Sequence, residues 1–226
     1  MAISTYSDLQ SAVGDWLNRT DLTAVIPSFV ALTEANLNRT LRVRDMLTRA
    51  TLTWNSAICP LPTDFLELYS LEQTSPPDAA TVPPLRYVGV EELKQIKSTL
   101  TPGLTRWYTI WGNYIELFPP PDGLNEDAST DYNMTLTYYA SIPSLSNAEP
   151  TNWLLTKSPD AYLYGSLLQA APYLKNDERI QVWDAAYQRA ISSLQIESER
   201  AMRPTTYSSE GSPNGVSTRF DDTSAS

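Results

Sequence analysis

The spacing of apolar residues along the chain changes between a helical period and a period of two. Residues 27–46 carry an apolar stripe at mostly helical spacings, and Pro27 suits the first turn of a helix, where its missing N–H is not needed. Ser7 and Gln10 have the spacing of a capping box and predict an earlier helix that ends near Asn18. The pattern therefore predicts two N-terminal helices. The stripe of the second helix consists of Phe29, Val30, Leu32, Leu37 and Leu41.

The middle of the chain has the period of β-strands. From Thr48 onward, apolar and polar residues alternate, as expected of a strand with one buried face. The same alternation runs from Tyr132 to Tyr138. Residues 107–111 and 114–118 flank Gly112-Asn113, a two-residue loop that tolerates positive φ and favours a β-hairpin. The middle therefore predicts an antiparallel β-domain.

Helical signals return further along the chain. Residues 90–96 predict a short surface helix. Residues 158–160, Ser-Pro-Asp, supply an N-cap, a first-turn proline and an acidic first turn. Residues 176–178 open a last helix that reaches Ala201 and is stopped by Pro204. Its apolar stripe consists of Ile180, Trp183, Tyr187, Ile191 and Leu194.

These elements predict an α+β fold. We expect a four-helix bundle formed by the N- and C-terminal helix pairs, from residues 1–46 and 149–202. Residues 47–148 form the inserted antiparallel β-domain. Residues 203–226 form an extended C-terminal tail that is rich in Ser, Thr, Gly and Asp. Such a segment has few apolar anchors, so we expect it to be flexible or ordered only by a partner.

The charge of the chain limits its partners. It carries 16 Lys and Arg against 26 Asp and Glu, a formal net charge of −10 over 226 residues. Nucleic-acid binders neutralise phosphates with basic residues, so this composition argues against specific DNA or RNA binding. DNA could still pass along an acidic wall. We see no secretory signal pattern and no apolar run long enough to span a membrane, which predicts synthesis in the cytoplasm and no membrane partner.

Residues suited to catalysis are few. The chain has no histidine and one cysteine, which excludes Ser-His-Asp and Cys-His arrangements and a zinc site built from several cysteines. Cys59 lies in an apolar setting and is expected to be an inert thiol. The neighbouring carboxylates at 64 and 67, and at 91 and 92, are expected on solvated faces. We therefore predict no enzyme, no cofactor and no metal site.

Aromatic residues are numerous, with 6 Trp and 13 Tyr. Tyr and Trp favour half-buried sheet surfaces and protein interfaces. Trp107, Tyr108 and Trp111 on one hairpin could also stack on sugars. A carbohydrate-binding role therefore stays open beside ordinary packing and subunit contact.

Four arginines follow the second predicted helix: Arg39, Arg42, Arg44 and Arg49. One interpretation is that they neutralise the partial negative charge at the helix C-terminus. The other is that they form a surface for an acidic protein partner. We take them as candidate protein-interaction residues, together with four residues of the tail. These are Arg203, Tyr207, Arg219 and Phe220.

Several motifs, taken in order, resemble a known family. They are Tyr6-Ser7-Asp8-Leu9-Gln10 with Trp16-Leu17-Asn18-Arg19, Ile26-Pro27 leading to Leu32-Thr33-Glu34-Ala35 and Leu37-Asn38-Arg39, Leu61-Pro62-Thr63-Asp64-Phe65-Leu66-Glu67-Leu68, and Asn152-Trp153-Leu154-Leu155 near Pro159-Asp160-Ala161-Tyr162-Leu163. Up to about residue 200, the chain resembles the head-to-tail adaptor proteins of short-tailed phages, which are similar to tail tubular protein A.

The resemblance implies a virion structural protein of the phage neck. It implies a homo-oligomeric ring, of twelve copies in the family, between the portal protein and the tail nozzle or tail tubular protein. The ring would line the channel that DNA crosses during ejection. The alternative is a carbohydrate-binding or glycan-degrading tail protein.

Overall fold

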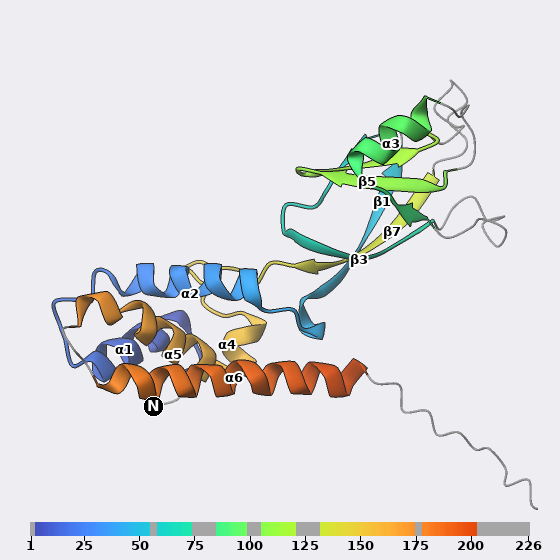
Figure 1. Ribbon diagram of the computed structural model, residues 1–226. Helices are drawn as coiled ribbons and strands as arrows, with labels where there is room; N and C mark the ends of the chain where they lie inside the picture. Colours follow the sequence, from blue (N-terminus) through green and yellow to red (C-terminus); the bar gives the residue numbers. More distant parts are fainter. Residues whose placement is uncertain are drawn as a thin grey trace, which may run out of the picture.

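The computed structural model describes residues 3–54, 58–73, 85–98, 105–120, 132–174 and 178–202. It has a mixed α+β fold, which confirms the predicted class. Figure 1 shows most helices gathered in one unit, the helical unit, and the sheets with α3 in a second, the β unit. Two stretches of chain join them, one from α2 to β1 and one from β7 to α4.

The helical unit has α5 at its centre, because α5 contacts each of the other long helices. Its core combines side chains from both ends of the chain, among them Leu9, Phe29, Tyr162 and Trp183. The predicted α5 and α6 are confirmed, and a short helix, α4, precedes α5. The arrangement as a four-helix bundle of two pairs stays a prediction. The helices are α1 (Tyr6–Leu17), α2 (Ile26–Thr40), α4 (Trp153–Lys157), α5 (Pro159–Gln169) and α6 (Arg179–Met202), with short 3-10 helices η1 (Arg44–Met46) and η4 (Ala171–Tyr173).

The first helix starts earlier than predicted. Thr5 is its N-cap, and its hydroxyl oxygen accepts a hydrogen bond from the Asp8 N–H at 3.2 Å. The Asp8 carboxylate in turn accepts from the Thr5 N–H at 3.0 Å. The predicted capping box of Ser7 and Gln10 is therefore wrong, since the aspartate three residues after Thr5 closes the box instead.

The second helix is shorter than predicted, since α2 ends at Thr40 and not near Met46. Leu41 has extended backbone angles, and its N–H still bonds the Leu37 carbonyl at 2.8 Å. Leu41, Val43 and Met46 are all buried in the helical core. Because these residues are apolar, their spacing predicts a longer helix. The chain has already left the helix at this point and runs toward the sheets.

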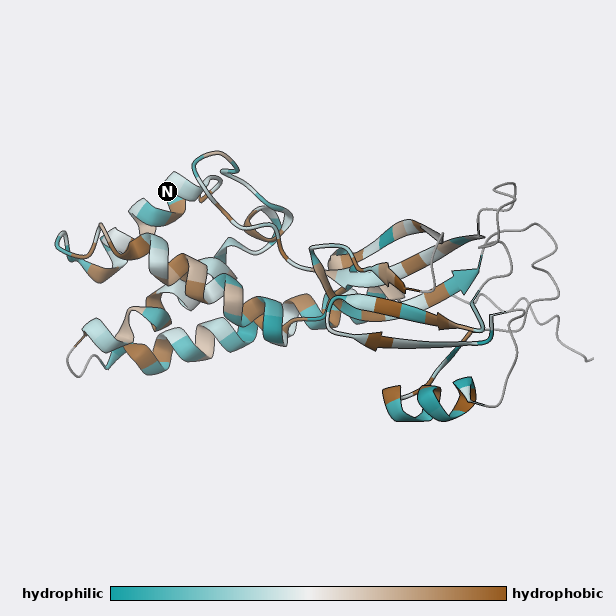
Figure 2. Cartoon of the chain, turned by 90° about the horizontal axis from the view of Figure 1, so that it is seen from above, coloured by the Kyte–Doolittle hydropathy of each residue, from teal (hydrophilic) through white to brown (hydrophobic). Residues whose placement is uncertain are grey.

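The β unit contains two sheets with α3 (Val90–Lys97) at its outer side. The three-stranded sheet has the order β1-β7-β3, and the four-stranded sheet has the order β2-β6-β5-β4. Alternating brown and teal residues along the strands in Figure 2 reflect one buried and one polar face. The strands are β1 (Leu47–Trp54), β2 (Ile58–Pro60), β3 (Phe65–Gln73), β4 (Arg86–Tyr87), β5 (Trp107–Trp111), β6 (Tyr114–Phe118) and β7 (Tyr132–Ala140).

The predicted hairpin is confirmed. β5 and β6 pair antiparallel, with Trp111 opposite Tyr114 on either side of the two-residue loop. Gly112 has φ of 56°, a conformation that glycine adopts without steric penalty. The β-domain is not wholly antiparallel, however, because β4 pairs parallel to β5 through Arg86 and Tyr87. β4 has only two residues, so the sequence does not predict the direction of this strand.

The close approach of α5 to α2 makes a testable prediction. A Cβ on Gly165 would collide with the Thr33 methyl group and lie 3.2 Å from a ring carbon of Tyr187. We expect Gly165→Ala to lower the free energy of unfolding by about 1–3 kcal/mol, because overpacking outweighs the gain in helix propensity. Urea denaturation at neutral pH measures this change.

Gly14→Ala is the matched control in another helix. Its new Cβ would meet only the Ile26 methyl group, at an ordinary 3.6 Å, so we expect this variant to gain up to about 1 kcal/mol. Equal effects of the two substitutions would contradict the close packing at Gly165.

Candidate protein-interaction surface

The chain leaves α2 through a segment that joins the two units, and the predicted arginines lie on or beside it. We call residues 41–47 the junction. It contains η1 and runs directly into β1. Its apolar residues pack into the helical core, while its polar residues contact β3, α4 and α6, so the junction fixes where the first sheet starts.

Arg42 has a structural role in the junction. Its Nη1 donates hydrogen bonds to the carbonyl oxygens of Asn38 and Leu41, at 2.9 and 2.6 Å. These carbonyls lie at the end of α2, where helix acceptors lack partners. Its Nε donates to the Glu67 carboxylate on β3 at 2.8 Å. Arg39, which is exposed, donates from Nε to the Ala35 carbonyl at 3.1 Å. The bonds from Arg42 and Arg39 to backbone carbonyls of α2 agree with the interpretation that these two arginines stabilise the C-terminal end of the helix.

The side chains of Arg44 and Arg49 are exposed. The backbone N–H of Arg44 donates to the Ser198 hydroxyl on α6 at 2.7 Å, but its side chain is exposed. Arg49 lies on β1 opposite Thr137 and is also exposed. Within the part of the chain that the structure describes, neither guanidinium has an ion-pair partner. These two arginines are available to a partner, in contrast to Arg42.

Lys157 holds the junction to the helical unit. Its Nζ lies 2.9 Å from carboxylate oxygens of both Asp45 in η1 and Glu197 in α6. Hydrogen bonds from the lysine to Asp45 and then to Glu197 raise the pKa of Lys157. The lysine remains charged at neutral pH and links three elements, α4, η1 and α6.

The second connection between the units is held by a buried polar cluster, which we call the Glu34 cluster. The Glu34 carboxylate, only 5% exposed, accepts hydrogen bonds from the Leu145 N–H at 2.8 Å and the Tyr162 hydroxyl at 3.2 Å. Asn152 donates to the Tyr162 oxygen and to the Pro143 carbonyl, each at 2.7 Å. These bonds attach the segment between β7 and α4 to two helices, α2 and α5.

The hydrogen bonds of Asn152 also start α4, because its side-chain oxygen accepts from the Leu155 N–H at 2.8 Å. Burial raises the pKa of Glu34, against the hydrogen bonds from Leu145 and Tyr162, which lower it. Burial also raises the pKa of Tyr162. Sequence reasoning missed this cluster as a unit, although Glu34 and Asn152 both lie in motifs of the family resemblance.

The predicted aromatic trio on the hairpin does not form one platform. Trp107 packs beside the small core under α3, and Tyr108 packs against the core between the sheets. Only Trp111 is exposed, at 43%, and its ring pairs with that of Tyr114, 44% exposed, at a centroid distance of 5.5 Å. The trio therefore gives no support to sugar stacking.

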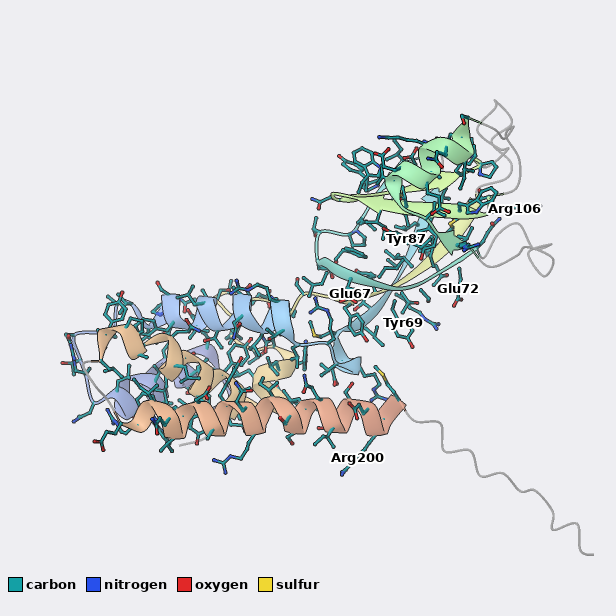
Figure 3. All side chains as sticks on the ribbon, in the orientation of Figure 1. Glu67, Tyr69, Glu72, Tyr87, Arg106 and Arg200 are labelled. Atoms are coloured by element: carbon teal, nitrogen blue, oxygen red, sulfur yellow. The ribbon has the colours of Figure 1, made fainter. Side chains whose placement is uncertain are left out.

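Three of the four neighbouring carboxylates considered above have structural partners. Asp64 accepts a hydrogen bond from the Tyr138 hydroxyl at 2.9 Å, and burial with this bond raises the pKa of Tyr138 to about 12. Glu67 pairs with Arg42, and Glu91 pairs with Lys94 at 2.8 Å. Figure 3 shows Glu67, Tyr69 and Glu72 along β3, Arg106 and Tyr87 at a distance from them in the β unit, and Arg200 near the end of α6.

The described residues contain no group of three acidic, cysteine or histidine side chains placed to hold a metal ion. None of the helices described is both long and apolar enough to cross a membrane. The four predicted tail residues, Arg203, Tyr207, Arg219 and Phe220, lie outside the described residues.

Comparison with protein families identifies a match to most of the chain. A family model described as SU10 adaptor protein matches residues 4–208. This span includes every helix and strand described above. No curated protein matches the chain.

Because burial raises the pKa of Glu34, the Glu34 cluster stabilises the fold more when this carboxyl is protonated. That stability is present below the unfolded pKa and is lost as the pH rises through the folded pKa. We expect Glu34→Gln, which keeps an acceptor for Leu145 and Tyr162, to become more stable relative to the wild type as the pH rises from 4 to 7. Urea denaturation across this range measures the difference.

Glu72→Gln is the control, since Glu72 is an exposed carboxylate on β3. Its denaturation midpoint should follow that of the wild type at every pH. If the stability of Glu34→Gln also runs parallel to that of the wild type across this pH range, burial does not raise the pKa of Glu34.

Proposed function

The chain belongs to the SU10 adaptor protein family, and on this basis we propose that it joins the head and the tail of a short-tailed phage. The predicted relation to phage head-to-tail adaptors is confirmed at the level of the family. Membership in a family of structural adaptors favours a component of the virion without enzymatic activity. The family match is the observation that carries this proposal.

In the proposed assembly, identical copies form a ring between the portal protein and the tail nozzle or tail tubular protein. We expect twelve copies, the number that the family resemblance implies. The net charge of −10 per copy would let DNA cross the channel without binding to its wall, because an acidic surface repels phosphates. The role of the protein is then mechanical, as a platform and a conduit.

We propose three parts with different tasks. Residues 1–46 with 149–202 form the helical domain, and residues 47–148 form the inserted β-domain. Residues 203–226 form an arm that extends onto the portal or a neighbouring copy, with Arg203, Tyr207, Arg219 and Phe220 as its contact residues. The segment is polar enough to need a partner for ordering.

The arginines support assembly of an acidic chain. Copies with a charge of −10 repel one another, so a ring needs basic contacts or cations at its interfaces. Arg44 and Arg49 have exposed guanidinium groups without an ion-pair partner in the described part of the chain. We propose that they contact carboxylates of the portal or of the next copy. Arg42 mainly completes the end of α2, and Arg39 adds positive charge to its last turn.

Charge reversal tests this assignment. We expect Arg44→Glu combined with Arg49→Glu to weaken assembly on purified portal rings by about tenfold or more, because each contact changes from attraction to repulsion. Native mass spectrometry of the adaptor mixed with its cognate portal measures both the affinity and the number of copies bound.

Arg106→Glu is the charge-matched control, since Arg106 is exposed and lies away from the junction (Figure 3). It should assemble as the wild type does. Undisturbed assembly of the Arg44/Arg49 variant would reject the role of these arginines, and failure of the wild-type protein to bind the portal would reject the proposed function.

A further inference from the structure

The two edges of the three-stranded sheet differ in their protection against further pairing. β1 forms one edge and β3 the other, with β7 between them. β3 has register shifts between Phe65 and Glu67 and between Leu68 and Ser70. It also exposes Glu67 and Glu72. Irregular pairing and exposed charges are the features by which sheet edges avoid adding another strand.

β1 lacks these features. Its eight residues pair with β7 in one continuous register from Leu47 to Trp54. They include no proline and a single charged residue, Arg49. No strand among the described residues pairs with the other side of β1. A long, regular and nearly uncharged edge is a template for an added strand.

The charges next to this edge limit what can bind it. Arg49 on β1 and Arg44 just before it are exposed, while the neighbouring Arg42 and Lys157 already have acidic partners. A second β1 edge would add two more exposed arginines and no carboxylate within its strand, which disfavours symmetric pairing. The β3 edge of another copy is irregular. The binding strand should therefore be an extended segment with carboxylates.

We propose that residues 216–222 of a neighbouring copy add to the edge of β1 as an antiparallel strand. This inference rests on the proposed function, which supplies the neighbour. The segment reads Val-Ser-Thr-Arg-Phe-Asp-Asp, with β-branched and aromatic residues at alternate positions, as in a strand. It follows α6 in the sequence.

In one register of this pairing, side chains on both faces of the added strand lie opposite complementary residues of β1. With Asp221 opposite Arg49, an antiparallel strand places Arg219 opposite Thr51, away from Arg49. Phe220 then lies opposite Ala50, a small, half-buried residue at the rim of the core between the sheets. Large and small side chains are complementary at such a position, and opposite charges stabilise a directly opposed pair.

The linker before residue 216 is long enough to reach a neighbouring copy. Ser198, one turn before the end of α6, bonds the Arg44 N–H at 2.7 Å, so α6 ends close to the start of its own β1. Residues 203–215 could span about 43 Å when extended, at about 3.3 Å per residue. A reach of this size allows contact with an adjacent copy, and the cross-links described below distinguish this from pairing within one chain.

A pair of engineered cysteines tests the partner and the register together. In the full-length chain with Cys59→Ser, Thr51→Cys and Arg219→Cys place two thiols on the same face at opposed positions, where the Cα separation suits a disulfide. We expect portal-bound rings under a mild oxidant to give disulfide-linked dimers and longer chains of copies. Non-reducing electrophoresis measures them.

The matched control moves one thiol to the other face of the added strand. Thr51→Cys with Thr218→Cys should cross-link about fivefold less, because neighbouring strand positions point to opposite faces. A second test exchanges charges: Arg49→Glu should weaken assembly about fivefold per contact, and Asp221→Arg in the same chain should restore it.

The outcomes separate this inference from the proposed function. Rings with the predicted cross-link and with charge rescue support the pairing. Rings in which both cysteine pairs react equally, in which links form only within one chain, or in which no link forms overturn the pairing alone. Absence of any assembly on the portal overturns the pairing and the proposed function together.

Discussion

The buried carboxylate of Glu34 is the constraint on which the rest of the fold depends. It accepts hydrogen bonds from the Leu145 N–H and the Tyr162 hydroxyl, and Asn152 completes the cluster. The chain leaves the helical unit after α2 and must return to form α4, α5 and α6. Without acceptors on α2, the returning backbone would carry buried N–H groups without partners, at a cost of about 1–3 kcal/mol each.

The junction and the Glu34 cluster together hold the β unit at two points. Arg42 and Lys157 secure the outgoing chain, and Asn38 accepts a hydrogen bond from the Ile142 N–H of the returning chain at 2.8 Å. Two crossings restrain rotation of one unit against the other better than a single linker would. Beside this connection, Arg44 and Arg49 are exposed and have no ion-pair partner among the described residues.

Sequence reasoning succeeded where local chemistry determines the structure. Gly112-Asn113 specified the hairpin, and Pro159 marked the start of α5. It failed at the end of α2, because Leu41, Val43 and Met46 are apolar for reasons of tertiary packing. Sheet order, the parallel β4–β5 pair and the Glu34 cluster depend on contacts between distant residues, which periodicity does not contain. The sequence predicts the arginines as interaction residues, but only the structure distinguishes Arg42, which is paired with Glu67, from the exposed Arg44 and Arg49.

We propose that many copies of this chain form the joint between head and tail. Cryo-electron microscopy of the phage neck tests it most directly, because the helical unit and the β unit have recognisable shapes (Figure 1). We predict a ring of density directly below the portal into which repeated copies of the fold fit, with the DNA channel at its centre. A neck whose density is fully explained by other proteins, with this chain absent from the particle, would contradict the claim.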